Sequence, residues 1–177
     1  MVTLRKSWWL VVLAFGLLVS LASAADKMEM DHNHQMTATA EGQVICPVLG
    51  QKASKAISYQ YKGKTYYFCC AGCVNDFKKN PDKYLTRIKE FQVSAKKYAF
   101  NPAEIKVKQN DIVRITFSSE DVTHGFMIKE YGINVSVKKG EIKKVEFLAD
   151  KKGTFVFRCS VYCGADHSKM TGKLVVE

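Results

Sequence analysis

Apolar and polar residues alternate along several short runs in the C-terminal half of the chain, which is the pattern of half-buried β-strands. In residues 112–117, for example, isoleucine, valine and phenylalanine are interspersed with arginine and threonine. Pairs typical of turns, such as Lys139-Gly140 and Lys152-Gly153, separate these runs. The pattern predicts a β-sandwich whose strands lie at residues 91–100, 105–107, 112–117, 125–128, 142–147, 154–159 and 173–176.

A different pattern precedes the expected sandwich. Aromatic, β-favouring residues flank the turn signal Lys62-Gly63-Lys64 and predict a hairpin. Apolar positions recur at a helical spacing from Val74 onwards and predict a short helix that is broken near Pro81. We therefore expect a mainly β chain, in which a small α+β domain at residues 41–88 is joined to the sandwich at 91–177 by a short link at residues 87–90.

The N-terminus has the composition of an export signal. Arg5 and Lys6 precede an apolar run, and Ala22-Ser23-Ala24 follows it as a small-residue cleavage pattern. We expect residues 1–24 to be a signal peptide that is removed, which predicts a periplasmic or secreted protein. The alternative is an uncleaved anchor, since the apolar run reaches the lower limit for spanning a bilayer. Contact with a membrane is expected only in that case.

Residues 25–40 are polar and show no apolar periodicity, so we expect a disordered arm. Thioether and imidazole side chains recur in this arm, at Met28, Met30, His32, His34 and Met36. Their density indicates either a weak copper-collecting tail or a chance bias in composition.

Soft metal ligands gather near the C-terminus. Cys159, Cys163, His167 and Met170 lie within twelve residues, and His124 follows an expected strand further upstream. Sulfur and imidazole donors together select copper over hard cations. One cysteine with two histidines and a methionine would describe a mononuclear blue-copper site, whereas a second thiolate lets two cysteines bridge two copper ions. A structural disulfide between the two cysteines is the alternative in an exported protein.

This ligand spacing resembles that of the CuA cupredoxins, the copper domains of cytochrome c oxidase subunit II and nitrous oxide reductase. The resemblance covers residues 91–177 and implies a Greek-key β-sandwich with a dinuclear copper centre. It implies side-chain ligands at His124, Cys159, Cys163, His167 and Met170, and a backbone carbonyl ligand at Val161. Val161 also stands where the family usually has an acidic residue, and Met127 where it usually has an aromatic one. Docking as an ordinary oxidase subunit is therefore not expected.

The other four cysteines fall in the small α+β domain. Cys46-Pro47-Val48 opens it, and Cys69, Cys70 and Cys73 follow the expected hairpin. This arrangement resembles the YHS/TRASH family of small metal-binding domains, which implies ligands at Cys46, Cys69 and Cys73 and leaves Cys70 as a neighbouring thiol. The converging sulfurs would hold zinc or copper(I). A disulfide from Cys46 to one of the later cysteines is the alternative staple for so small a core.

The charge of the chain bears on its partners. Lysine and arginine number 27 against 17 acidic residues, and loss of Arg5 and Lys6 with the signal peptide leaves a net charge near +8. Lysine pairs such as 96–97 and 138–139 are dispersed over strand ends and turns. Such a surface either protects strand edges and keeps the protein soluble, or attracts an acidic redox partner or an anionic membrane. Nucleic acid is not an expected partner of an exported copper protein.

Every cysteine and histidine falls in the arm, the cysteine-rich domain or the C-terminal ligand set. We expect one-electron transfer through a CuA-type centre, with a redox protein as partner. The alternative is copper handling, in which the cysteine-rich domain passes copper to the cupredoxin and the partner is a copper donor or acceptor. Catalysis by the chain alone is not expected, since it has neither a further histidine for a substrate-binding copper nor an acid/base pair.

Overall fold

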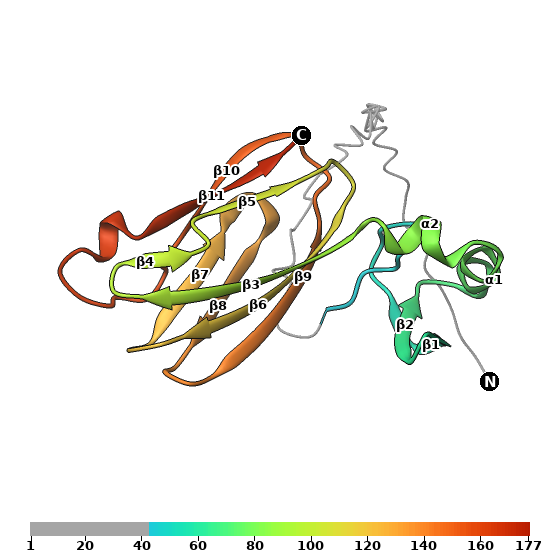
Figure 1. Ribbon diagram of the computed structural model, residues 1–177, viewed down its shortest axis with the longest axis horizontal. Helices are drawn as coiled ribbons and strands as arrows, with labels where there is room; N and C mark the ends of the chain where they lie inside the picture. The colour runs from blue at the N-terminus through green and yellow to red at the C-terminus, as the bar shows by residue number, and fades with distance from the viewer. Residues whose placement is uncertain (1–42) are drawn as a thin grey trace, which may run out of the picture. The chain divides into compact units, whose positions relative to one another are not determined.

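The computed structural model describes residues 43–177, so the expected signal peptide and arm lie outside the described residues. Within residues 43–177, no helix is both long and apolar enough to cross a membrane. The described chain contains a two-stranded hairpin with two short helices, followed by a five-stranded and a four-stranded sheet (Figure 1). The expected mainly β fold is confirmed.

The hairpin and helices form a small α+β unit. Strands β1 (Ser54–Tyr61) and β2 (Lys64–Phe68) pair antiparallel around the Lys62-Gly63 turn. Helices α1 (Ala71–Lys79) and α2 (Pro81–Leu85) follow, with Pro81 opening the second helix as the sequence predicts.

Phe77 on α1 is the centre of the small unit's core. Its side chain is fully buried, and its ring centroid lies 5.2–6.4 Å from those of five other aromatic residues, namely Tyr59, Tyr61, Tyr66, Phe68 and Tyr84. These rings come from β1, β2 and α2, so one side chain of α1 packs against all three other elements of the small unit.

The four-stranded sheet of the sandwich has the order β4-β3-β6-β9. Its central strand β6 (Ile112–Ser119) pairs in parallel with β3 (Ile88–Lys96) and antiparallel with β9 (Ile142–Leu148), while β4 (Ala99–Asn101) lies at the edge beside β3. Along β6 the odd-numbered positions are buried and the even-numbered ones from 114 onwards are partly exposed, as the alternation in the sequence predicts.

The five-stranded sheet has the order β5-β11-β10-β7-β8. It consists of β5 (Glu104–Val107), β7 (His124–Ile128), β8 (Ile133–Val137), β10 (Gly153–Arg158) and β11 (Thr171–Val176). The chain passes repeatedly from one sheet to the other, which gives the Greek-key β-sandwich.

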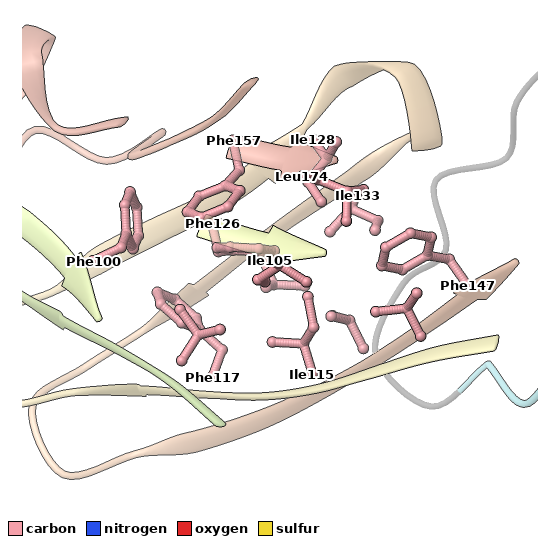
Figure 2. Close-up of a cluster of buried hydrophobic side chains, with 14 of the residues drawn as sticks. Phe100, Ile105, Ile115, Phe117, Phe126, Ile128, Ile133, Phe147, Phe157 and Leu174 are labelled. Carbon is pink, nitrogen blue, oxygen red and sulfur yellow. The ribbon is translucent and has the colours of Figure 1, made fainter. Parts of the chain in front are cut away.

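Both sheets bury their inner faces in one hydrophobic core (Figure 2). Phe100, Phe117, Phe126 and Phe157 form an aromatic group in it, with ring centroids 5.1–6.2 Å apart. The loop at residues 159–170 leaves β10 and returns to β11 at the end of the sandwich where β4 lies (Figure 1). The core therefore fixes the two strands between which the ligand loop is suspended.

The structure differs from the sequence-based expectations at three places. The run 91–100 is divided into β3 and β4 by a turn at residues 97–98, and β8 was not predicted. β3 begins at Ile88, so residues 88–90 are strand rather than link. Ile88 pairs with Ile112 of the sandwich and also packs against the core of the small unit.

A few polar contacts join the small unit to the sandwich. The Ile45 amide donates to Glu146 Oε1 at 2.7 Å, and the Arg87 guanidinium donates to the carbonyl oxygens of Val48 and Asn110. The division into domains at 41–88 and 91–177 stays a prediction.

Candidate metal centres

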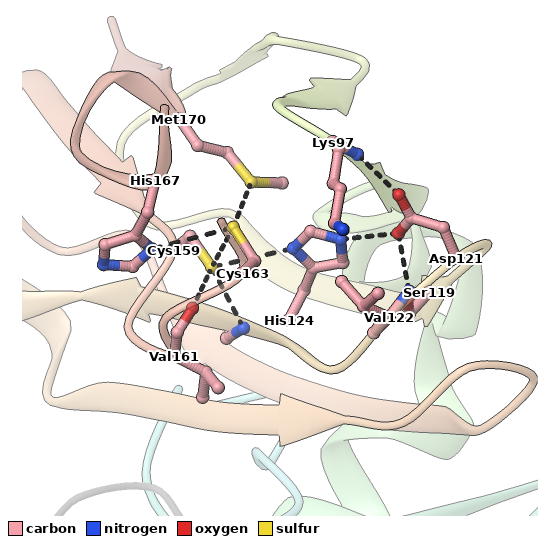
Figure 3. A network of polar contacts seen from close by, with 11 residues as sticks. Lys97, Ser119, Asp121, Val122, His124, Cys159, Val161, Cys163, His167 and Met170 are labelled. Atoms are coloured by element: carbon pink, nitrogen blue, oxygen red, sulfur yellow. Dashed lines mark hydrogen bonds and ion pairs between the residues drawn. The ribbon is translucent and has the colours of Figure 1, made fainter. Parts of the chain in front are cut away.

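His124 begins β7 and is fully buried. Its Nε2 lies 2.7 Å from Asp121 Oδ1, and its Nδ1 lies 3.7 Å from Cys159 Sγ (Figure 3). The carboxylate accepts a hydrogen bond from Nε2–H, so Nδ1 is left as the nitrogen that can bind a metal.

Asp121 is itself firmly held. Its two oxygens accept hydrogen bonds from the amides of Lys97 and Val122, at 2.9 and 2.7 Å. Burial alone would raise the pKa of Asp121, but the Lys97 amide, the His124 ring and the Val122 amide together lower it to about 2. Sequence reasoning missed this residue, although a buried histidine ligand requires such an acceptor and Asp121 is three residues upstream.

The loop at residues 159–170 brings the other expected ligands to His124. Cys159 and Cys163 are buried, with their sulfurs 3.9 Å apart. Cys163 Sγ lies 3.7 Å from His167 Nδ1 and 3.9 Å from Met170 Sδ. The ligand atoms of His124, Cys159 and Cys163 all lie within 4.8 Å of one another. The structure therefore brings the five expected side chains together.

The sixth expected ligand, the Val161 carbonyl oxygen, lies 3.1 Å from Cys159 Sγ. The Gly125 amide approaches the same sulfur at 3.4 Å. Burial and the nearby Cys159 thiol raise the pKa of Cys163 to about 11. A thiol with a raised pKa keeps its proton until a cation replaces it. The sulfur and imidazole donors together fit a soft metal such as copper.

Contacts with the rest of the sandwich hold the ligand loop. The Cys159 amide donates to the Met170 carbonyl at 3.1 Å, which closes the base of the loop. The Ala165 amide donates to Tyr98 Oη at 3.1 Å, and Gly164 beside it has a φ of +135° and packs directly against the Tyr98 ring. Tyr98 was not singled out in the sequence, because its role depends on a contact with residues far along the chain.

Tyr162 lies between the two cysteines of the loop and is 78% exposed. Its ring centroid is 5.8 Å from that of His167. The ligand set is thus buried on the side of His124 and faces an exposed aromatic side chain on the side of His167.

A second group of sulfurs lies in the small unit. Cys46 precedes the hairpin, Cys69 follows β2, and Cys73 lies in the first turn of α1. Their sulfurs all lie within 4.8 Å of one another, and Cys46 and Cys73 are buried. Cys70 is exposed, and its sulfur lies 3.3 Å from that of Cys73. All six cysteines of the chain are free thiols in the structure.

The thiols of the second group differ in acidity. Burial would raise the pKa of Cys46, but hydrogen bonds from the amides of Leu49, Cys69 and Val48 outweigh it and lower the pKa. The pKa of Cys73 is raised, mainly by burial and then by the adjacent sulfurs. The three converging sulfurs are a donor set that a thiophilic cation would complete.

The remaining expected copper donors, His32 and His34 with the three methionines of the arm, lie outside the described residues.

Comparison with known proteins finds a family match for the small unit, and relatives that are similar to about half of the chain. The YHS domain family matches residues 45–88. Cytochrome c oxidase subunit 2 of Thermus thermophilus is 31% identical over 97 residues, which are 55% of this chain and 68% of that protein. Nitrous-oxide reductase of Stutzerimonas stutzeri is 36% identical over 83 residues, which are 45% of this chain and only 13% of that enzyme.

Two solved structures are similar to the chain in part. A heme-copper terminal oxidase dimer matches with a TM-score of 0.47 and 29% identity, over 50% of this chain and 65% of that one. The periplasmic domain of subunit II of cytochrome oxidase from Bradyrhizobium japonicum matches with a TM-score of 0.46 and 21% identity, over 50% of this chain and 83% of that one.

Proposed function

Because the chain belongs to the cytochrome c oxidase subunit 2 family, we propose that its C-terminal half is an exported electron-transfer module with a dinuclear, CuA-type copper centre. The nitrous-oxide reductases that it also matches are enzymes of which it covers a small part. The proposal is accordingly a copper module that exchanges electrons with a redox protein, and not a catalyst by itself.

One observation carries the proposal of a dinuclear centre. The two sulfurs lie 3.9 Å apart, and each has its own imidazole nitrogen at 3.7 Å, from His124 for Cys159 and from His167 for Cys163. A mononuclear site needs only one thiolate, whereas this site contains two pairs of a thiol and an imidazole, one for each of two copper ions.

Each proposed ligand would have its own role in holding the copper pair. Cys159 and Cys163 would bridge, His124 and His167 would bind terminally, and Met170 with the Val161 carbonyl would adjust the reduction potential. The copper pair supplies one-electron redox chemistry when it is bound. The core strands and the Asp121 carboxylate keep the ligands in place, so that little reorganisation accompanies a change of charge.

Cys159→Ser tests this proposal. One thiolate cannot bridge symmetrically, so the electron paramagnetic resonance spectrum should change from the hyperfine pattern of two equivalent copper nuclei to that of one nucleus, or disappear. Ser160→Ala is the matched control, because Ser160 is exposed and its hydroxyl donates a hydrogen bond to Asn134, which is not among the proposed ligands. An unchanged two-copper spectrum in Cys159→Ser would refute the dinuclear centre.

A second candidate function is copper handling by the small unit. The observation that favours it is that the sulfurs of Cys46, Cys69 and Cys73 lie within 4.8 Å of one another, apart from the proposed copper ligands of the sandwich. Copper(I) or zinc would bind there as the completing cation. Titration of the reduced chain with copper(I) tests it, because Cys46→Ser should lose one bound ion. The spectrum that the C-terminal centre shows after one-electron oxidation by ferricyanide should not change.

A further inference from the structure

The four thiols of the small unit are not equivalent. Cys46 and Cys73 are buried, Cys69 is half-buried, and these three form the mutually close group. Cys70 stands outside that group and is exposed at the N-cap of α1, where its side chain makes no capping hydrogen bond. The sequence alone left Cys70 as an unassigned extra thiol, and the structure places it on the rim of the group.

Cys73 connects the rim to the interior. Its sulfur lies 3.5 Å from that of Cys69 and 3.3 Å from that of Cys70. Metal–sulfur bonds of about 2.3 Å allow two sulfurs on one ion to be separated by up to roughly 4.6 Å. An ion on Cys73 can therefore be shared either inward with Cys69 or outward with Cys70, with little movement of the backbone.

We propose that Cys70 is the transfer ligand of this site, through which copper(I) moves between the buried thiols and the thiolates of an acceptor. The inference rests on the second candidate function, the binding of copper(I) by the small unit. The acceptor that we name is the Cys159/Cys163 pair in a second copy of the chain, since it has the same ligand chemistry and its loop carries the exposed Tyr162. Within one chain the two sites lie at opposite ends of β3, which begins at Ile88 beside the small unit and ends at the turn that holds Tyr98 against the ligand loop, so one ion cannot bind both.

The step is a ligand exchange without a change of oxidation state. As Cys70 binds the ion as a thiolate and releases its proton, one bond from copper(I) to an inner sulfur breaks, and the freed thiolate takes up a proton. The two acceptor thiols then release their protons and replace first Cys73 and then Cys70 on the ion, and each freed thiolate takes up a proton. The exposed position of Cys70 is essential, because neither buried sulfur can reach an acceptor.

Cys70→Ser in the full-length, reduced chain tests the inference. The C-terminal centre is first disabled by Cys159→Ser with Cys163→Ser, so that the remaining cysteine thiols all belong to the small unit. In this background Cys70→Ser should still bind one ion, but its release to the chelator bathocuproine disulfonate should slow roughly tenfold or more. Asn75→Ser, an exposed polar change on the same helix, should leave the release rate unchanged.

The outcomes separate the inference from its premise. If the background chain binds no copper(I), copper handling by the small unit is wrong and the inference falls with it. If Cys70→Ser binds copper(I) and releases it at the rate of the background chain, Cys70 is not a transfer ligand. The same holds if Cys70→Ser fails to bind the ion, as Cys73→Ser should, because Cys70 is then one of the holding ligands. In both cases the background chain still binds copper(I), so the premise stands.

A second arm identifies the acceptor. In the otherwise unaltered chain, copper(I) loaded on the small unit should reach the C-terminal centre, where one-electron oxidation by ferricyanide then develops the absorption of the copper pair. A rate proportional to protein concentration supports transfer to a second copy, provided that Cys70→Ser slows it. A rate independent of concentration, or one that Cys70→Ser leaves unchanged, contradicts the inference.

Discussion

At the scale of single residues, the orientation of His124 depends on a carboxylate that stands beside the ligand set. Asp121 Oδ1 accepts a hydrogen bond from His124 Nε2 over 2.7 Å, while two backbone amides donate to the carboxylate and fix it in place. The imidazole is thus held with Nδ1 towards Cys159 before any metal binds. Loss of such a hydrogen-bond partner of a ligand histidine typically lowers the affinity of the site for its metal.

Asp121→Asn should therefore alter the copper centre without removing a ligand. An amide can accept the same proton but carries no charge, so we expect copper to bind and its hyperfine splitting and reduction potential to shift. The metal-free chain should lose about 1–3 kcal/mol of unfolding free energy, the usual cost of weakening a buried, charged hydrogen bond. Glu120→Gln removes the same charge one residue earlier on an exposed side chain and is the control. Identical spectra and stability in the two variants would contradict this role.

The same carboxylate predicts an acid-dependent loss of stability in the metal-free chain. The pKa of Asp121 is about 2 in the folded protein against an ordinary 3.8, so the unfolded chain binds more protons between these values. The stabilisation is complete above pH 4 and disappears as the pH falls towards 2, and it amounts to about 2 kcal/mol. Urea unfolding at a series of pH values should show this loss of unfolding free energy in the wild type and not in Asp121→Asn.

At the scale of elements, the ligand loop is shaped by a contact with the β3–β4 turn. Gly164 has a φ of +135°, and a Cβ there would collide with the Tyr98 hydroxyl and ring. Gly153, at the start of β10, has nearly the same φ of +138°, but a Cβ there would meet only the Phe155 ring, at an ordinary contact distance of 3.5 Å. The pair therefore separates backbone strain, which both positions share, from steric conflict with the loop's support.

Gly164→Ala should destabilise the chain by more than Gly153→Ala, which carries the backbone strain of about 1–3 kcal/mol expected for alanine at such a φ. It should also change the copper spectrum, because the loop must move away from Tyr98 and carries Cys163 and His167 with it. Thermal unfolding and the spectrum of the copper-loaded chain measure the two effects. Equal destabilisation with an unchanged spectrum in both variants would show that the Tyr98 contact does not position the loop.

The elements also show how far sequence patterns reach. The alternation at residues 112–117 predicted β6, and Pro81 predicted the break between α1 and α2. The same period of two at Ile133, Val135 and Val137 marks β8 and was overlooked, while the apolar run Tyr98-Ala99-Phe100 concealed the turn that separates β3 from β4. The ligand spacing located the candidate site, but Asp121 and Tyr98 act through contacts that only the folded backbone brings about.

At the scale of the whole molecule, the chain places one group of soft donors in each of its two hydrophobic cores. Cys159, Cys163 and Met170 belong to the sandwich core, and Cys46 and Cys73 to the core around Phe77. The sandwich buries a large apolar set of its own, whereas the small unit has five buried residues and a ring of half-buried ones. A core of that size gains much from a bound cation.

The two halves should consequently be separable, with unequal results. We expect residues 87–177 to fold and bind copper alone, because the core and all proposed copper ligands of the sandwich are internal to that range. A fragment starting at residue 90 should be less stable by about 1 kcal/mol, since it loses the pairing of Ile88 with Ile112 and the burial of Ile88. Thermal unfolding and copper binding of both fragments check this. If residues 87–177 are unfolded while the full chain is folded, the contacts of Ile45 with Glu146 and of Arg87 with Val48 belong to an interface that the sandwich requires, and the division of the chain near residue 88 is wrong.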